Sequence, residues 1–226
     1  MKVLETRNVR KIYHTPSGEV HALDGVSISV EDGQFVAIIG SSGSGKTTLL
    51  NMLGGLDNPT DGVVFVRGED IGRLKVDELT VFRRRNIGFV FQNYNLVPVL
   101  NVYENIMLPL QLDGRGPDER FFEQIIDTLK LREKLDSMPH MLSGGQQQRV
   151  AIARALSAKP AVILADKPTG NLDSVTGMEV VGLLKSSASL FHQTIVVVTH
   201  NEEIAQMTDH IIRIEDGKVR GGKDEE

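Results

Sequence analysis

Apolar runs alternate along the chain with segments whose apolar positions recur at helical spacing. Continuous apolar runs, typical of strands buried on both faces, occupy residues 34–39, 161–165 and 194–199. Helical composition or spacing occurs at residues 46–53, 77–85, 146–158 and 175–190. Strands that alternate with helices predict an α/β fold, with a parallel sheet covered by helices.

Both ends of the chain have sequence patterns typical of antiparallel strands joined by turns. Residues 3–13 and 20–30 are predicted as two strands joined by a turn through residues 15–18, and a further strand is expected at 63–66. Residues 210–220 predict a hairpin that turns at Asp216-Gly217. The amino-terminal strands therefore predict an antiparallel β layer attached to the main sheet.

The middle of the chain changes character. After a strand expected at 87–91, strand signals stop, and residues 102–110 and 118–129 have helical spacing. We therefore predict a single domain over 1–226, with a mixed-sheet core and its β layer at 1–92 and 160–226. A mostly helical subdomain is inserted at about 93–159.

Composition excludes several functions. The net charge of −5 argues against general nucleic-acid binding, and the absence of cysteine excludes disulfides and thiol catalysis. The longest apolar runs fall well short of the ~18 residues of a membrane span, so any membrane role is expected to come through a partner.

A glycine-rich segment follows the strand at 34–39. Gly40-Ser41-Ser42-Gly43-Ser44-Gly45-Lys46-Thr47 matches the phosphate-loop pattern, and Thr48 continues into a helix. Glycines let backbone N–H groups point inward at phosphate, and the helix N-terminus adds a positive field. We expect Lys46 to reach the β and γ phosphates of ATP and Thr47 to ligate Mg²⁺. The alternative is a chance glycine-rich turn.

Two further segments favour the same chemistry less specifically. Asp166 ends an apolar strand and is expected near Mg²⁺, although strands often end in aspartate. Leu142-Ser143-Gly144-Gly145-Gln146 precedes a helix, where it serves either as an anion-binding N-terminus or as a simple N-cap.

Taken in order, these motifs resemble those of the nucleotide-binding subunits of ABC transporters. The resemblance covers essentially the whole chain and adds Gln92 after Val90-Phe91, Asp173 in Gly170-Asn171-Leu172-Asp173, and His200 after Val198-Thr199. It implies a P-loop NTPase (RecA-like) fold, ATP and Mg²⁺ as cofactors, and ATP hydrolysis.

The resemblance also implies roles for single residues. Tyr13 would stack on adenine, or is an ordinary strand aromatic; Gln92 would sense Mg²⁺ and the attacking water, or is a surface glutamine. His200 would contact the γ-phosphate, or is a structural histidine. The segment Leu142 to Gln146 would bind the γ-phosphate held by a second copy, so that a homodimer sandwiches two ATP molecules, with Asp173 at the interface.

One position departs from the family pattern. The family places a catalytic glutamate directly after the Mg²⁺ aspartate, and this chain has Lys167. An ammonium group has no acceptor lone pair and carries the opposite charge. Lys167 is therefore an engineered change, a natural degeneration or a sequence error. We predict that the chain binds ATP and dimerises but hydrolyses ATP very slowly.

Local phrases narrow the resemblance to bacterial ATPases of lipoprotein release, macrolide export and antimicrobial-peptide resistance. These phrases lie at residues 15–23, 54–57, 91–96 and 168–173. They imply a separate membrane subunit with a large extracytoplasmic domain, and a location on the cytoplasmic face of the membrane.

The apolar residues within 94–112 would dock that membrane subunit, or are ordinary core. Two other functions stay open: a non-transport regulatory ATPase of the same fold, and an interaction-only nucleotide-binding subunit.

Overall fold

The continuous apolar runs form the centre of a six-stranded sheet in the computed structural model, which describes residues 1–16 and 18–220. The strand order is β11-β10-β4-β9-β8-β7. Neighbours from β10 to β7 are parallel, whereas β10 and β11 form the antiparallel hairpin predicted at the carboxyl end. The strands are β4 (Phe35–Ile39), β7 (Ile87–Phe91), β8 (Val162–Asp166), β9 (Thr194–Val198), β10 (His210–Glu215) and β11 (Lys218–Arg220).

The second sheet is the predicted antiparallel layer. It contains β1 (Lys2–Thr15), β2 (Gly18–Val26), β3 (Ser29–Glu31), β5 (Asp61–Val66) and β6 (Glu69–Asp70). The single strand predicted at 20–30 is wrong, because the buried Thr6 hydroxyl interrupts the ladder. It donates to Val26 O at 3.0 Å and accepts from Ile28 N at 3.0 Å, which separates β2 from β3. Ser17, in the predicted turn, lies outside the described residues.

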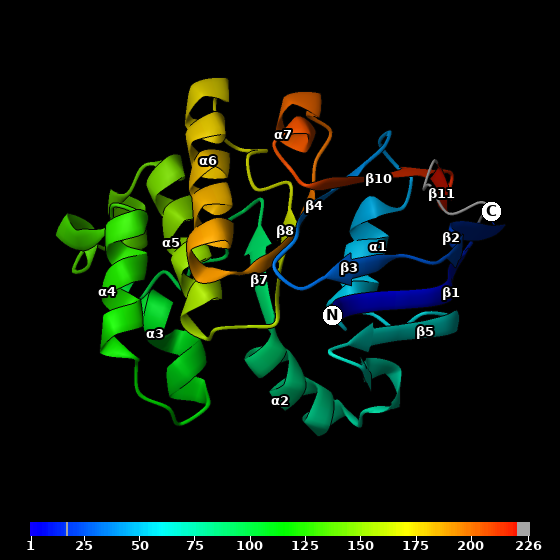
Figure 1. The fold of residues 1–226 in the computed structure, drawn as a ribbon, viewed down its shortest axis with the longest axis horizontal. Helices are drawn as coiled ribbons and strands as arrows, with labels where there is room; N and C mark the ends of the chain where they lie inside the picture. The colour runs from blue at the N-terminus through cyan, green and yellow to red at the C-terminus, as the bar shows by residue number, and fades with distance from the viewer. Residues whose placement is uncertain (17, 221–226) are drawn as a thin grey trace.

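Helices surround the larger sheet (Figure 1). They are α1 (Lys46–Leu53), α2 (Val76–Asn86), α3 (Val102–Leu112), α4 (Glu119–Thr128), α5 (Gly144–Ser157), α6 (Ser174–Phe191) and α7 (Glu202–Gln206). Short 3-10 turns occur at Ile71–Arg73, Arg132–Lys134 and Pro139–Met141. Periodicity does not predict α7, because five residues are too few to show a helical repeat.

The larger sheet separates two hydrophobic cores. Successive side chains of a strand point to opposite faces, so Ile38 enters one core and Ile39 the other. The first core packs α1 and the antiparallel layer against the sheet. The second packs α3, α4, α5 and α6 on the opposite face. The helices α1 and α5 therefore lie on different sides of the sheet (Figure 1).

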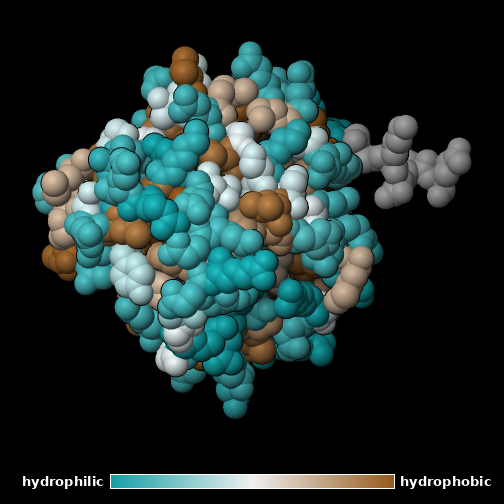
Figure 2. Space-filling view, turned by 60° about the vertical axis from the view of Figure 1, so that its left-hand side comes forward, coloured by the Kyte–Doolittle hydropathy of each residue, from teal (hydrophilic) through white to brown (hydrophobic). Residues whose placement is uncertain are grey.

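The molecular surface over the helical side is mixed. Figure 2 shows apolar residues there as small separate patches between polar ones. Among the described residues, no helix is both long and apolar enough to cross a bilayer. The α/β fold class is confirmed; the boundary between core and helical subdomain stays a prediction.

Candidate functional site

Parallel pairing brings the ends of four strands to one edge of the larger sheet. In register, Phe91 lies opposite Asp166, Asp166 opposite Val198, and Val198 opposite Ile38. The chain leaves these four strands into Gln92, Lys167, Thr199 and Gly40. Ligands of open α/β sheets bind at this carboxyl edge, so the topology itself collects the predicted site residues.

Glycines shape the loop that leads from β4 into α1. Gly40 has φ of 152° and Gly45 has φ of 104°, in the region that side chains disfavour. A Cβ at Gly40 would lie 2.0 Å from Ile214 O, and one at Gly45 would lie 2.3 Å from Ala22 O. The close backbone approach at both ends therefore requires glycine.

The Lys46 side chain is folded into this loop and is only 6% exposed. Its Nζ donates to Gly40 O at 2.9 Å, Ser41 O at 2.5 Å and Ser44 Oγ at 3.3 Å. Burial lowers the pKa of Lys46, the charge of Lys167 lowers it further, and Asp166 opposes both. The ammonium group is thus desolvated and lies close to a second cation, an environment that favours an anion.

Thr47 and Asp166 form the metal-competent part of the site. The Thr47 hydroxyl lies 3.3 Å from both carboxylate oxygens of Asp166. Oxygen donors with one carboxylate fit Mg²⁺, which binds through few protein ligands together with substrate phosphates. Burial raises the pKa of Asp166, while Thr47, Lys167 and Lys46 act in the other direction.

Asp166→Asn is expected to raise the melting temperature of the nucleotide-free protein at neutral pH. Because the carboxyl pKa is raised above its ordinary 3.8, the ionised side chain destabilises the fold at pH 7. The folded form binds this proton more tightly than the unfolded form. The difference in melting temperature between Asp166→Asn and the wild type should therefore narrow as the pH falls toward that ordinary pKa. Thermal unfolding of both proteins at several pH values measures it. A melting temperature at pH 7 that is unchanged or lower would contradict the prediction.

Lys167 begins the loop after β8. Its backbone has φ of 46°, and its N–H donates to Val198 O at 3.0 Å. Lys167 borders a hollow of about 230 Å³ that His200 and Asp173 also line. His200 lines a second hollow with Gly40 and Ser41. His200 therefore lies between the start of the phosphate loop and the loop that contains Lys167.

Gln92 follows β7 but turns toward a different loop. Its Nε2 donates to Asn171 Oδ1 at 3.0 Å. Asn171 Nδ2 donates in return to Gln92 O at 3.0 Å and to Asn93 Oδ1 at 2.9 Å. Sequence reasoning missed Asn171, although it stands within the segment 170–173 that attracted attention for Asp173.

Tyr13 lies on β1 near the start of α1. Its hydroxyl donates to Asp57 Oδ2 at 3.0 Å, and the Lys11 ammonium lies 4.9 Å from the ring centroid. Burial raises the pKa of Tyr13, Asp57 raises it further, and a hydrogen bond with Thr48 lowers it. The contact with Thr48 places the ring beside the phosphate loop, 37% exposed.

The segment at residues 142–146 forms the N-terminus of α5. Ser143 Oγ accepts from Gln146 N at 3.3 Å, and Ser143 N donates to Gln146 Oε1 at 2.9 Å, a reciprocal capping box. A Cβ at Gly144 would lie 2.7 Å from the Tyr94 hydroxyl, and one at Gly145 would lie 2.5 Å from Thr176 Cγ2. Capping and packing therefore explain this segment locally without excluding a phosphate contact.

Asp173 is likewise a helix cap. Its Oδ1 accepts from Thr176 N at 3.0 Å at the start of α6. The hydrogen bond with the Thr176 side chain lowers the carboxyl pKa most, and the bond from the Thr176 backbone lowers it further. The Asp173 side chain is exposed, so a second role at an interface is open to it.

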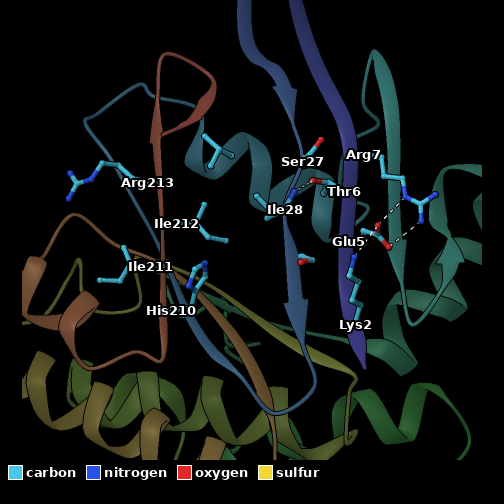
Figure 3. A pocket seen from close by; sticks show the side chains of 12 residues that line it. Lys2, Glu5, Thr6, Arg7, Ser27, Ile28, His210, Ile211, Ile212 and Arg213 are labelled. Atoms are coloured by element: carbon cyan, nitrogen blue, oxygen red, sulfur yellow. Dashed lines mark hydrogen bonds and ion pairs between the residues drawn. The ribbon is translucent and has the colours of Figure 1, made fainter. Parts of the chain in front are cut away.

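A hollow of about 440 Å³ lies away from all of these residues, between β10 and the strands β1 and β3 (Figure 3). Glu5 accepts from Arg7 at 3.0 Å and lies 3.6 Å from Lys2, so much of the charge on that wall is paired. None of the predicted site residues borders it.

Comparison with known proteins agrees with this geometry. A model of the ABC transporter family matches residues 23–170. An uncharacterized ABC transporter ATP-binding protein of Thermotoga maritima is 48% identical over 222 residues, covering 97% of this chain and 94% of that protein.

Other relatives are larger. A macrolide export ATP-binding/permease protein, MacB, of Rhodopirellula baltica is 44% identical over 221 residues, covering 96% of this chain but 32% of that protein. The chain thus spans about a third of the length of the MacB relatives it matches.

One solved structure is of a similar cassette. The dimeric post-hydrolysis state of the cassette MJ0796 of Methanocaldococcus jannaschii, bound to ADP and phosphate, is 44% identical with a TM-score of 0.84. The match covers 96% of this chain and 97% of that one.

Proposed function

The chain belongs to the ABC transporter family of ATP-binding proteins, and from this membership we propose that it is the ATP-driven subunit of an export-type transporter. One observation carries the proposal: Thr47 and Asp166 lie 3.3 Å apart beside a loop that buries Lys46. That arrangement combines an oxygen site for a cation with a cradle for phosphate. Mg²⁺, when bound, would neutralise charge on the β and γ phosphates.

Several residues of this chain would have separate roles in binding ATP. Backbone N–H groups from Gly40 to Thr48 and the Lys46 ammonium would hold the phosphates, and Tyr13 would stack on adenine. His200 lines a hollow with Gly40 and Ser41 at the start of the loop, and from there it would contact the terminal phosphate. Lys167 stands where a carboxylate would polarise water, so hydrolysis is expected to be slow.

We further propose that ATP joins two copies. The helices α1 and α5 pack on opposite faces of the sheet, so we expect Ser143 to close over the nucleotide of the partner rather than its own. The dimeric state of the cassette MJ0796 supports the association of two copies. Because Lys167 retards hydrolysis, the ATP-bound dimer of this chain should be long-lived.

Ser143→Asp is expected to abolish ATP-dependent dimerisation while preserving the fold. Aspartate caps a helix as well as serine does and complements its dipole, but it brings a negative charge against phosphate. Light scattering after size exclusion with MgATP measures the dimer, and the melting temperature checks the fold. Asp118→Asn, a conservative change at the exposed cap of α4, is the matched control. If Ser143→Asp dimerises like the wild type, the segment is only a helix cap.

A separate membrane subunit is the expected partner, as the ATP-binding/permease names of the MacB relatives support. The apolar residues of 94–112 fall into two groups: Val102 is buried, whereas Val99 is 77% and Leu112 is 64% exposed. Leu112 borders a groove of about 280 Å³ between α2, α3, α5 and β7, with Phe89 and Phe91 in its wall. This groove is our candidate docking site for a helix of that subunit.

Leu112→Glu is expected to reduce association with the membrane subunit at least about tenfold, because it replaces an apolar contact by a charge that docking would have to desolvate. Affinity purification from detergent-solubilised membranes, with identification of a permease subunit, measures the association. ATP affinity should stay unchanged, and Leu190→Glu, on α6, is the control for an exposed leucine. Equal recovery with both variants would remove the groove from the proposal.

Two alternatives remain. An interaction-only subunit is favoured by Lys167, and ATP turnover distinguishes it. A regulatory ATPase without a membrane partner would fail to copurify any permease. The substrate class, the export direction, the large extracytoplasmic domain of the partner and the cytoplasmic location all remain parts of the proposal.

A further inference from the structure

Gln92 and Asn171 join two loops that leave the sheet at the same edge. The Gln92 amide donates to Asn171 Oδ1 at 3.0 Å, while Asn171 Nδ2 donates to the Gln92 carbonyl at 3.0 Å. The pair therefore forms a two-way clip between the end of β7 and the loop that precedes α6. The site chemistry described above does not use this clip.

Gln92 starts from a position next to the metal-competent residues. It directly follows Phe91, whose Cα lies opposite that of Asp166 in the register of β7 and β8. Its amide oxygen is of the chemical type that Mg²⁺ accepts. In the structure, however, the side chain is committed to Asn171, and Asp166 is contacted by Thr47 instead.

Gly170 makes room for this arrangement. A Cβ at that position would lie 2.6 Å from Gln92 Cδ and 2.7 Å from its Nε2. The Gln92 amide therefore packs directly onto the Gly170 backbone, and any larger residue there would displace it.

The backbone beyond Gln92 is held separately. Arg154, on α5, donates to Tyr94 O at 3.0 Å and to Asn95 O at 2.7 Å. Both of these residues have positive φ, 58° and 49°. Because Arg154 anchors this strained turn, a rearrangement at Gln92 can be confined to its side chain.

We propose that Asn171 is a positioning residue that holds the Gln92 amide away from the Mg²⁺ site. Mg²⁺ with ATP would have to draw Gln92 off Asn171, so the clip weakens the metal-dependent part of binding. The inference rests on the proposed ATP-binding function and adds a residue that sets its metal response. Asn171 acts only through Gln92 and is not a catalytic residue.

The test compares ATP affinity with Mg²⁺ and with a chelator, by calorimetry on the full chain. We define the magnesium gain as the dissociation constant for ATP measured with the chelator divided by the one measured with Mg²⁺. A neutral hydrogen bond contributes about 0.5–1.5 kcal/mol, so Asn171→Ala should raise the magnesium gain by about two- to tenfold. Gly170→Ala should raise it in the same way, because it displaces Gln92 while leaving Asn171 in place.

Two controls separate positioning from structure. Asn93→Ala removes the 2.9 Å bond from Asn171 to Asn93 but leaves Gln92 clipped, and the magnesium gain should not change. In a Gln92→Ala background, Asn171→Ala should have no effect. The inference would be overturned if neither Asn171→Ala nor Gly170→Ala changed the magnesium gain. It would also be overturned if Asn171→Ala changed the gain equally in the wild type and in the Gln92→Ala background. Failure of the wild type to bind ATP at all would overturn the proposed function, and this inference with it.

Discussion

Replacing Lys167 by glutamate is expected to raise ATP turnover by about 10²–10⁴-fold, the usual contribution of a general base. The lysine offers no acceptor to the attacking water, whereas a carboxylate does. Its backbone φ of 46° is as accessible to glutamate as to lysine, so the change should leave the loop in place. Phosphate release at saturating MgATP measures the effect.

Two comparisons make this measurement specific. Lys167→Gln removes the positive charge without adding a base, and it should recover only a small part of the rate. Lys167→Glu combined with Lys46→Ala should fall back to background, which excludes a contaminating ATPase. Equal turnover by the wild type and Lys167→Glu would refute the idea that Lys167 limits hydrolysis.

Replacing Lys46 by alanine is expected to weaken ATP binding by about 10²-fold or more. Each hydrogen bond from a charged group contributes about 1.5–3 kcal/mol, and Lys46 is expected to serve two phosphates. Since burial lowers the pKa of Lys46, the folded protein holds this cation at a disadvantage. The variant should therefore remain folded, and calorimetric titration with MgATP can be read directly.

Lys159→Ala supplies the matched control for charge, because Lys159 pairs with Asp118 at 2.7 Å on the surface and lies outside the site. Its ATP affinity should equal that of the wild type. If Lys46→Ala bound ATP with unchanged affinity while remaining folded, the loop would not be a phosphate site.

The parts of the fold that were predictable from sequence are those whose signal is local. Residues 34–39 are apolar at every position except Gln34, and Phe35–Ile39 form a central strand buried on both faces. The phosphate loop was recognisable because its glycines are imposed by backbone geometry, as the 2.3 Å approach at Gly45 shows. Family resemblance contributed Gln92, His200 and Asp173, which spacing alone does not single out.

The remainder depends on contacts between distant segments. Thr6 splits the strand predicted at 20–30 through bonds across about 20 positions, and no local pattern reveals this. Asn171 contacts Gln92 across 79 positions, so sequence alone shows only that Asn171 stands two positions before Asp173. For Ser143 the local role is the predictable one, because the capping box with Gln146 can be recognised in the sequence. A contact between Ser143 and a second copy leaves no such local pattern.

The separation of α1 from α5 by the larger sheet has a consequence for how dimer formation depends on protein concentration. Since α1 and α5 lie on opposite faces of the larger sheet, we propose that a nucleotide bound beside α1 is covered by α5 of a second copy. Closure must then be bimolecular, and its extent should rise with the amount of protein present. On a membrane, two copies tethered to one transporter would meet at a high effective concentration, whereas free copies would close only at protein concentrations above the dissociation constant of the ATP-bound dimer.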